Sequence, residues 1–173
     1  MSNQEKYKYA YRLTSVSSTG LFFIEESLLR IMDNTTDMAY LRSYYILLSY
    51  NFELILKSRI VMTKSFFDKK SINDELRSLG HDIKNIGESL GEANLKDLGV
   101  EEITENDNQY KITTTDGKEI YIENFTKIRY DFLDDIMRNR DTQEHTRLKE
   151  YTEQLFSILR KAKEKNEEAK SQE

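Results

Sequence analysis

The chain has 173 residues, with 26 basic and 31 acidic side chains and a formal net charge of −5. A single domain of this length can bury enough surface to fold without a disulfide or a structural metal. The absence of cysteine excludes disulfide frameworks, thiolate zinc sites, iron–sulfur clusters and cysteine nucleophiles. The negative charge argues against a general nucleic-acid coat protein, whose affinity would come from neutralising phosphates.

We expect a cytoplasmic protein that does not contact a membrane, and we expect neither a metal nor a cofactor. The sequence has no run approaching about 18 consecutive apolar residues and no N-terminal apolar run typical of a secretion signal. Its two histidines, His81 and His145, cannot supply a three-histidine zinc site. Its glycines form neither a Walker loop nor a dinucleotide-binding loop.

The first half of the chain predicts two main helices after an N-terminal arm. Residues 1–18 are polar and aromatic, and we interpret them as an extended arm or a frayed helix. The apolar residues that follow recur at the spacing of one helix face: Leu21, Ile24, Leu28 and Ile31. From Leu41 to Phe67, apolar positions cover much of the helix circumference, which predicts the central and most buried helix. The chain also lacks proline, which favours long helices.

Shorter elements are predicted after the central helix. A short helix or turn begins near Ser71, which resembles a helix start, and ends at Gly80, which resembles a helix stop. A further periodic run opens at Asp82 and ends near Gly99. Residues 101–108 carry four acids and no base, which predicts a solvated loop.

The sequence predicts one β-hairpin, at about residues 109–123. This segment is rich in threonine, isoleucine and tyrosine, and it is centred on Asp116-Gly117, a strong hairpin signal. Two strands alone are only marginally stable. We therefore expect the hairpin to be an insertion that packs against the helices.

The helical period returns after the hairpin, and residues 164–173 are predicted to form a polar C-terminal tail. One apolar set after Asn124 comprises Phe125, Ile128, Phe132, Leu133 and Ile136. A last helix carries Leu148, Tyr151, Leu155, Ile158 and Ala162. The sequence therefore predicts a mainly α protein, an up-and-down bundle of about five helices over residues 19–163 with the hairpin inserted.

Two charged residues lie where the helical pattern predicts apolar side chains. Arg129 has phenylalanine and leucine at the neighbouring positions of its helix surface, and Glu53 has isoleucine and leucine. Burying an unpaired charge costs several kcal/mol. We therefore predict that Arg129 meets Glu53 or Asp82 inside the bundle. The alternatives are an arginine that extends its guanidinium into water, and a ligand site.

Other polar residues allow two interpretations. Glu53 with Lys57 is either an ordinary surface pair one helical turn apart or part of a buried cluster. His81 beside Asp82 is either a residue next to a helix cap or a chemical group. A basic stretch contains Lys57, Arg59, Lys64, Lys69 and Lys70. We favour the solvated end of a helix for this stretch over a phosphate-binding patch.

Three segments resemble motifs of the HEPN superfamily of helical-bundle domains. They are Phe52-Glu53-Leu54-Ile55-Leu56-Lys57 with its E-x-x-x-K pattern, Gly80-His81-Asp82-Ile83, and Ile128-Arg129-Tyr130. The resemblance covers roughly residues 40–160. It implies a bundle of four or five helices, frequently dimeric, of the kind found in nucleotide-binding modules and in ribonucleases of prokaryotic toxin–antitoxin and antiviral defence systems. It also implies a partner protein encoded nearby.

The catalytic branch that this resemblance implies has an arginine, four to six residues and then a histidine. Arg140 and Arg138 precede His145 at such spacings. There His145 would be the general acid or base and an arginine would stabilise the phosphorane-like transition state, without a metal. The residues between Arg140 and His145 are polar, whereas that branch has apolar residues, so we prefer the non-catalytic branch. In the non-catalytic branch, a set of polar residues would hold the core together or line a small anionic pocket between helices. The set is Arg129-Tyr130, His81, Glu53 and Lys57.

The preferred prediction is therefore a non-catalytic, dimeric HEPN-like accessory protein that associates with a nucleotide or RNA. The first alternative is a metal-independent HEPN endoribonuclease that uses Arg140 or Arg138 with His145. The second is a helical module that binds another protein through the hairpin or the last helix.

Overall fold

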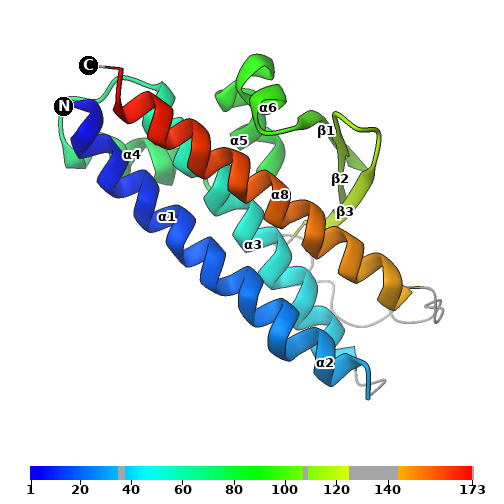
Figure 1. Cartoon of the computed structure of the whole chain (residues 1–173). Helices are drawn as coiled ribbons and strands as arrows, with labels where there is room; N and C mark the ends of the chain where they lie inside the picture. The colour runs from blue at the N-terminus through cyan, green and yellow to red at the C-terminus, as the bar shows by residue number, and fades with distance from the viewer. Residues whose placement is uncertain (35–37, 107–108, 125–143, 173) are drawn as a thin grey trace.

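The structure is a computed structural model of the chain and describes residues 1–34, 38–106, 109–124 and 144–172. Three long helices lie side by side in it: α1 (Asn3–Phe23), α3 (Met38–Thr63) and α8 (Glu144–Lys170) (Figure 1). A short π-helical segment, η1 (Ile24–Leu28), and α2 (Leu29–Met32) continue α1. The predicted mainly α bundle with an inserted hairpin is confirmed.

The central helix of the bundle is α3. Every residue from 51 to 62 is buried, because α1 and α8 pack along one side of α3 and α5 and β3 contact the other. Side chains fix α8 beside α3, since the Tyr44 hydroxyl donates to the Leu148 carbonyl at 2.6 Å. The prediction of a most buried helix between Leu41 and Phe67 is confirmed.

The N-terminal segment differs from its prediction. Helix α1 begins at Asn3, with Ser2 and Glu5 forming a capping box, so residues 3–18 are a regular helix rather than an extended arm or a frayed end. The buried face of α1 consists largely of polar and small side chains: Lys6, Ala10, Thr14, Ser17 and Leu21. Such a face produces no apolar period in the sequence, which is why the helix was not predicted.

The C-terminal tail is corrected in the same way. Helix α8 continues to Lys170, so residues 164–170 belong to it. Asn166 is only 1% exposed and bonds to two residues of α3: its amide nitrogen donates to Ser58 Oγ at 3.2 Å, and its oxygen accepts from Arg59 at 2.9 Å. This contact with α3 is made by one polar side chain. The composition of the segment is otherwise mostly charged, so nothing in the sequence indicates that the helix continues here.

Three short helices follow α3: α4 (Lys69–Ser78), α5 (Ile83–Leu90) and α6 (Glu92–Asp97). Of these, α5 packs against α3, and α6 contacts α5, β1 and α8. The predicted short helix begins with Asp68 rather than Ser71, because the Asp68 carboxylate accepts from the Ser71 backbone N–H at 2.8 Å. Gly91 separates α5 from α6, so the run predicted to end near Gly99 is two helices.

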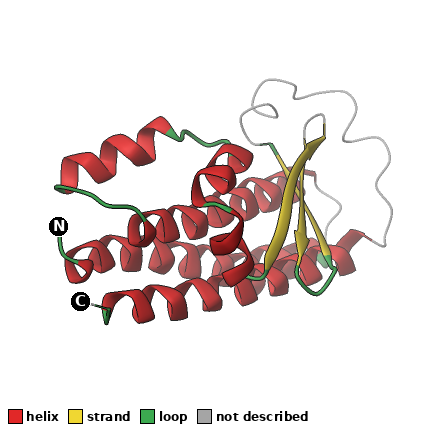
Figure 2. Ribbon diagram, turned by 90° about the horizontal axis from the view of Figure 1, so that it is seen from above, coloured by secondary structure: helices red, strands yellow, loops and turns green. Residues whose placement is uncertain are grey.

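A small antiparallel sheet stands beside the helices (Figure 2). Its order is β1 (Val100–Asn106), β2 (Gln109–Thr114) and β3 (Glu119–Glu123). The predicted hairpin is confirmed in β2 and β3, and Gly117 supplies the turn with a φ of 80°. The loop predicted for residues 101–108 is wrong over 101–106, which form β1. This edge strand keeps Glu101 and Glu102 in solvent, where charges are tolerated.

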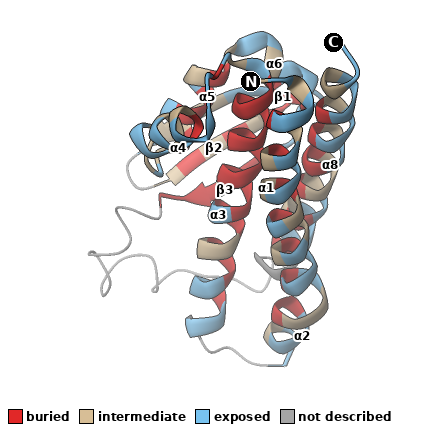
Figure 3. Ribbon diagram, turned by 90° about the vertical axis from the view of Figure 1, so that its left-hand side faces the viewer, coloured by how far each residue is buried: buried red, intermediate tan, exposed pale blue. Residues whose placement is uncertain are grey.

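The sheet presents one face to the helices. Four inward side chains are buried there: Tyr110, Ile112, Ile120 and Ile122. They belong to the same apolar cluster as the core of α3, and Figure 3 shows buried positions along β2 and β3. The hairpin therefore leans on the helices, as predicted for strands that cannot be stable alone.

Candidate functional site

Glu53 and Lys57 form a buried ion pair on α3. Their side chains are 7% and 9% exposed, and Lys57 Nζ lies 2.7 Å from Glu53 Oε1. The interpretation as an ordinary surface pair is therefore wrong. A buried pair needs further hydrogen bonds to offset the loss of water around both charges. The turn that follows α4 supplies them.

Gly80 and His81 bring that turn onto α3. Gly80 has a φ of 59°, a left-handed conformation that favours glycine, and its carbonyl accepts from Lys57 Nζ at 2.6 Å. His81 Nδ1 lies 3.0 Å from Glu53 Oε2 and 3.2 Å from Oε1. Glu53, Lys57 and His81 thus form one hydrogen-bonded unit, the Glu53–Lys57–His81 cluster, which joins segments 23 to 28 residues apart.

The accessible part of this cluster is its imidazole. The His81 side chain is 56% exposed, whereas the Glu53 side chain beneath it is 7% exposed. An ionised carboxylate only accepts hydrogen bonds, so His81 donates from Nδ1. The cluster therefore holds an imidazole in a fixed orientation at the surface.

Asp82 is separate from this cluster and has a structural role. Its Oδ1 accepts from the backbone N–H groups of Lys84 and Asn85 at 3.0 and 3.1 Å, which caps α5. The hydroxyl of Tyr110 on β2 donates to the same oxygen at 3.3 Å. Burial and the charge of Asp82 raise the pKa of Tyr110 well above its usual range. This bond fastens the sheet to α5.

The sequence did not single out Tyr110 as a site residue. Its signal was the hairpin alternation, which turns Tyr110 and Ile112 to the same face. Nothing in the sequence pairs that face with Asp82, because the pairing depends on how the sheet packs against α5.

The remaining predicted site residues cannot be placed. Arg129, Tyr130, Arg138 and Arg140 lie outside the described residues, and His145 lies in the first turn of α8, where only the backbone is described. The predicted meeting of Arg129 with Glu53 or Asp82 stays a prediction, and so does the pairing of Arg138 or Arg140 with His145.

Comparisons of the chain with protein-family models, with curated proteins and with solved structures find no match. In the described part of the chain, no three His, Cys, Asp or Glu side chains are grouped so that they could hold a metal ion. No described helix combines the length and the apolar composition needed to cross a membrane.

The structure separates the members of the basic stretch. Arg59 is buried, and burial lowers its pKa. Lys64 pairs with Glu75 at 2.5 Å and donates to Ser89 at 2.6 Å. Lys69 and Lys70 are exposed in the first turn of α4. The stretch therefore forms neither a single patch nor simply a solvated helix end.

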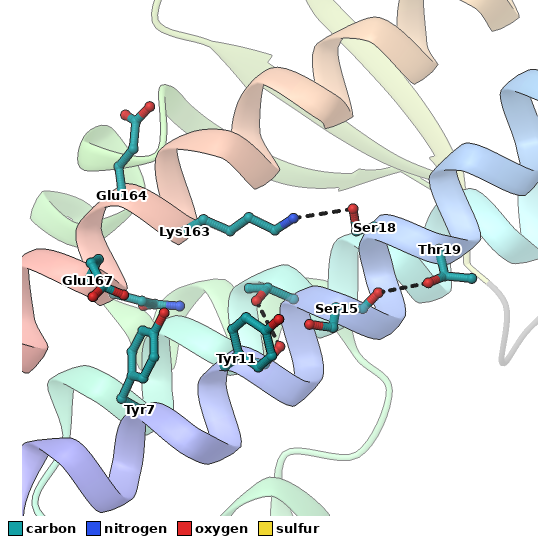
Figure 4. A pocket seen from close by; sticks show the side chains of 10 residues that line it. Tyr7, Tyr11, Ser15, Ser18, Thr19, Lys163, Glu164 and Glu167 are labelled. Carbon is teal, nitrogen blue, oxygen red and sulfur yellow. Dashed lines mark hydrogen bonds between the residues drawn. The ribbon is translucent and has the colours of Figure 1, made fainter.

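A groove of about 560 Å³ lies between α1 and α8 (Figure 4). Its polar groups largely satisfy one another: Lys163 Nζ donates to Ser18 Oγ at 3.2 Å, and Thr19 Oγ1 donates to the Ser15 carbonyl at 3.1 Å. The Tyr7 hydroxyl bonds to Glu167, which raises the pKa of Tyr7 to about 12. We interpret this groove as a hydrogen-bonded seam between two helices.

Proposed function

We propose that the chain is a HEPN-like accessory protein that associates with a nucleotide or RNA without cleaving it. The Glu53–Lys57–His81 cluster carries this proposal. It joins the E-x-x-x-K segment to the Gly80-His81-Asp82 segment, two of the three segments on which the resemblance depends. A direct hydrogen-bonded contact gives a physical reason for both segments to occur in one chain.

The chemistry of the cluster suits a phosphate. The carboxylate of Glu53 bonds to both Lys57 and His81, and the imidazole is the exposed member of the three. In its protonated form an imidazole donates from both ring nitrogens, so His81 can then also donate to a phosphate oxygen, and hydrogen bonds between ionised groups are stronger than neutral ones. The absence of cleavage is proposed from the polar residues between Arg140 and His145.

The rest of the proposal follows the resemblance. We place the protein in the cytoplasm, as a homodimer that acts with a protein encoded beside it in a prokaryotic defence or toxin–antitoxin system. A mass measurement in solution checks the dimer. A strict monomer would count against the resemblance.

Ring NMR of the two histidines tests the binding. His81→Ala and His145→Ala variants assign the two imidazole signals, and His145 then serves as the internal control. Adding a nucleoside monophosphate should shift the His81 ring signals, whereas the matching nucleoside without phosphate should leave them in place. If neither histidine signal responds to the phosphate, the proposed association at this cluster is wrong.

Incubation with mixed RNA tests the absence of cleavage. The intact protein and His145→Ala should both leave the RNA whole. Cleavage by the intact protein that disappears in His145→Ala would replace this proposal with the ribonuclease alternative.

A further inference from the structure

Phe67 is the most exposed of the large hydrophobic side chains in the described residues, at 96%. It lies in the loop between α3 and α4, next to Phe66, which is 8% exposed and packs in a small core cluster with Ala10 and Ile72. Phe66 therefore anchors the loop while Phe67 projects from it. A ring held this way on an anchored loop is accessible to a ligand that can stack on it.

Phe67 borders a hollow of about 340 Å³, which we name the Phe67 hollow. The first turns of α1 form one side of it, and the loop before α4 forms the other. Its lining includes Lys8, Tyr9, Arg12, Asp68 and Lys69. A volume of this size lies within the range of small-ligand sites.

Three cations of this hollow are available to a ligand. Lys8, Arg12 and Lys69 are exposed and make no ion pair with any side chain in the described ranges. Lys70 is exposed beside them and contributes to the lowered pKa of Asp68. These residues come from α1 and α4, which are far apart in the sequence, so the basic surface exists only in the folded chain.

The two acids of the hollow serve helix caps. Glu5 Oε2 accepts from the Ser2 backbone N–H at 3.0 Å. Asp68 Oδ1 accepts from the Ser71 backbone N–H, which is the main reason that the pKa of Asp68 is lowered. Both carboxylates thus have backbone partners but remain exposed, so the lining carries three basic and two acidic side chains and a net positive charge.

The placement of Lys69 and Lys70 runs against the usual charge preference of a helix. The N-terminus of a helix carries a partial positive charge and favours acids in its first turn, yet the first turn of α4 contains two lysines and no acid. A residue choice that opposes local stability is most common where function requires it.

We infer that the Phe67 hollow binds single-stranded nucleic acid, with an unpaired base stacked on Phe67 and phosphates on Lys8, Arg12 and Lys69. Exposed aromatic rings beside a cationic groove are the usual means of binding single strands, because every base has a face that can stack. A bilayer instead requires several apolar side chains lying in one plane, whereas one ring stands here beside a concave surface. The inference concerns a different surface from the Glu53–Lys57–His81 cluster and stands without the function proposed there.

Fluorescence anisotropy with a labelled oligothymidylate of about 12 nucleotides tests this inference on the full chain. Phe67→Ala should weaken binding at least about fivefold, the equivalent of about 1 kcal/mol of lost stacking. Phe22→Ala is the matched control, because Phe22 is 60% exposed on α1 and lies outside the hollow. Both rings are mostly exposed, so neither change should unfold the protein.

The dependence on salt tests the cations. Lys8→Gln with Lys69→Gln should reduce the slope of log affinity against log salt by about 1.4, or about 0.7 for each phosphate contact. Lys118→Gln with Lys149→Gln removes two exposed lysines elsewhere and should leave the affinity nearly unchanged. If both double variants lose the same affinity for the oligonucleotide, the loss reflects the net charge of the protein rather than the hollow, and the inference is wrong.

Three other outcomes would also overturn it. They are equal binding in Phe67→Ala and the intact protein, duplex binding as tight as single-strand binding, and no oligonucleotide binding at all.

Vesicles of phosphatidylcholine and phosphatidylserine in equal parts form a further arm of the experiment. Vesicle binding lost in Phe67→Ala, without oligonucleotide binding, would assign the surface to a membrane. Because this test uses Phe67 and the nucleotide test uses His81, the failure of one does not imply the failure of the other.

Discussion

The imidazole of His81 lies 3.0 Å from the carboxylate of Glu53, although 28 residues separate them in the chain. The ring is exposed at the surface, and the carboxylate belongs to the most buried part of α3. One contact thus links the core of the bundle to a group that solvent can reach. Glu53 also forms a buried ion pair with Lys57. Stability measurements on variants of Glu53 and Lys57 can therefore test this buried arrangement.

Glu53→Gln should lower the free energy of unfolding by about 3 kcal/mol, because it leaves the buried Lys57 charge without its carboxylate. Replacing both Glu53 and Lys57 with methionine should cost less than either single change, since no unpaired charge then remains. Urea denaturation measures both effects. A loss below about 0.5 kcal/mol in Glu53→Gln is the value typical of an exposed pair and would contradict the buried arrangement.

Tyr110→Phe should lower the free energy of unfolding by about 1.5 kcal/mol at neutral pH, because it removes a hydrogen bond to the charged Asp82. The folded pKa of Tyr110 lies above its usual value of 10.0. The contribution of the hydroxyl is therefore complete below pH 10.0 and declines as the pH rises further, when the unfolded chain loses the proton first. The gap between the two proteins should thus narrow above that pH. If the difference in unfolding free energy instead widens above that pH, the Tyr110 hydroxyl does not donate to Asp82.

Asn166→Ala should destabilise the protein by about 2 kcal/mol, because the buried Arg59 loses the acceptor of its N–H group. Glu164→Ala is the matched control two residues away, exposed on the same helix, and should change stability by less than about 0.5 kcal/mol. Thermal unfolding of the two variants checks the difference. Equal stability would mean that residues 164–170 behave as the polar tail predicted from composition.

Tyr7→Phe should move the pKa of Glu167 upward, towards its usual value, because the hydrogen bond from the Tyr7 hydroxyl is the main cause of its depression. NMR titration of the Glu167 carboxyl measures this shift. Lys170 also lowers this pKa, so the return should be partial. In the intact protein, ultraviolet titration should find one tyrosine that ionises at about pH 12. If the pKa of Glu167 is the same in Tyr7→Phe as in the intact protein, the Tyr7 hydroxyl does not bond to Glu167.

Apolar patterning determined how much of the fold could be predicted. The central helix was predicted because apolar residues cover α3, and the hairpin because Asp116-Gly117 is a specific turn signal. The start of α1 was missed because Thr14 and Ser17 form part of its buried face. Strand β1 was missed because an acidic edge strand resembles a loop in composition.

The candidate site shows a similar limit. Glu53 was identified as a charge at an apolar position of the helical pattern, Lys57 as its neighbour one turn away and His81 as the neighbour of a helix cap, but whether the three were part of a buried cluster stayed open. That question depends on where the turn after α4 packs, which is a tertiary property. Asp82 was read either as a cap or as a chemical group, and the cap is what the structure shows. Tyr110 carried no signal beyond strand alternation.

The two chain ends lie together at one end of the bundle (Figures 1 and 3). The Asn3 side-chain amide donates to the Ala169 carbonyl at 3.1 Å, and Met1 lines the Phe67 hollow. A purification tag or fluorescent protein fused to either end would therefore emerge beside that hollow and could obstruct it. The exposed turn at Asp116-Gly117 offers an insertion point on the sheet instead.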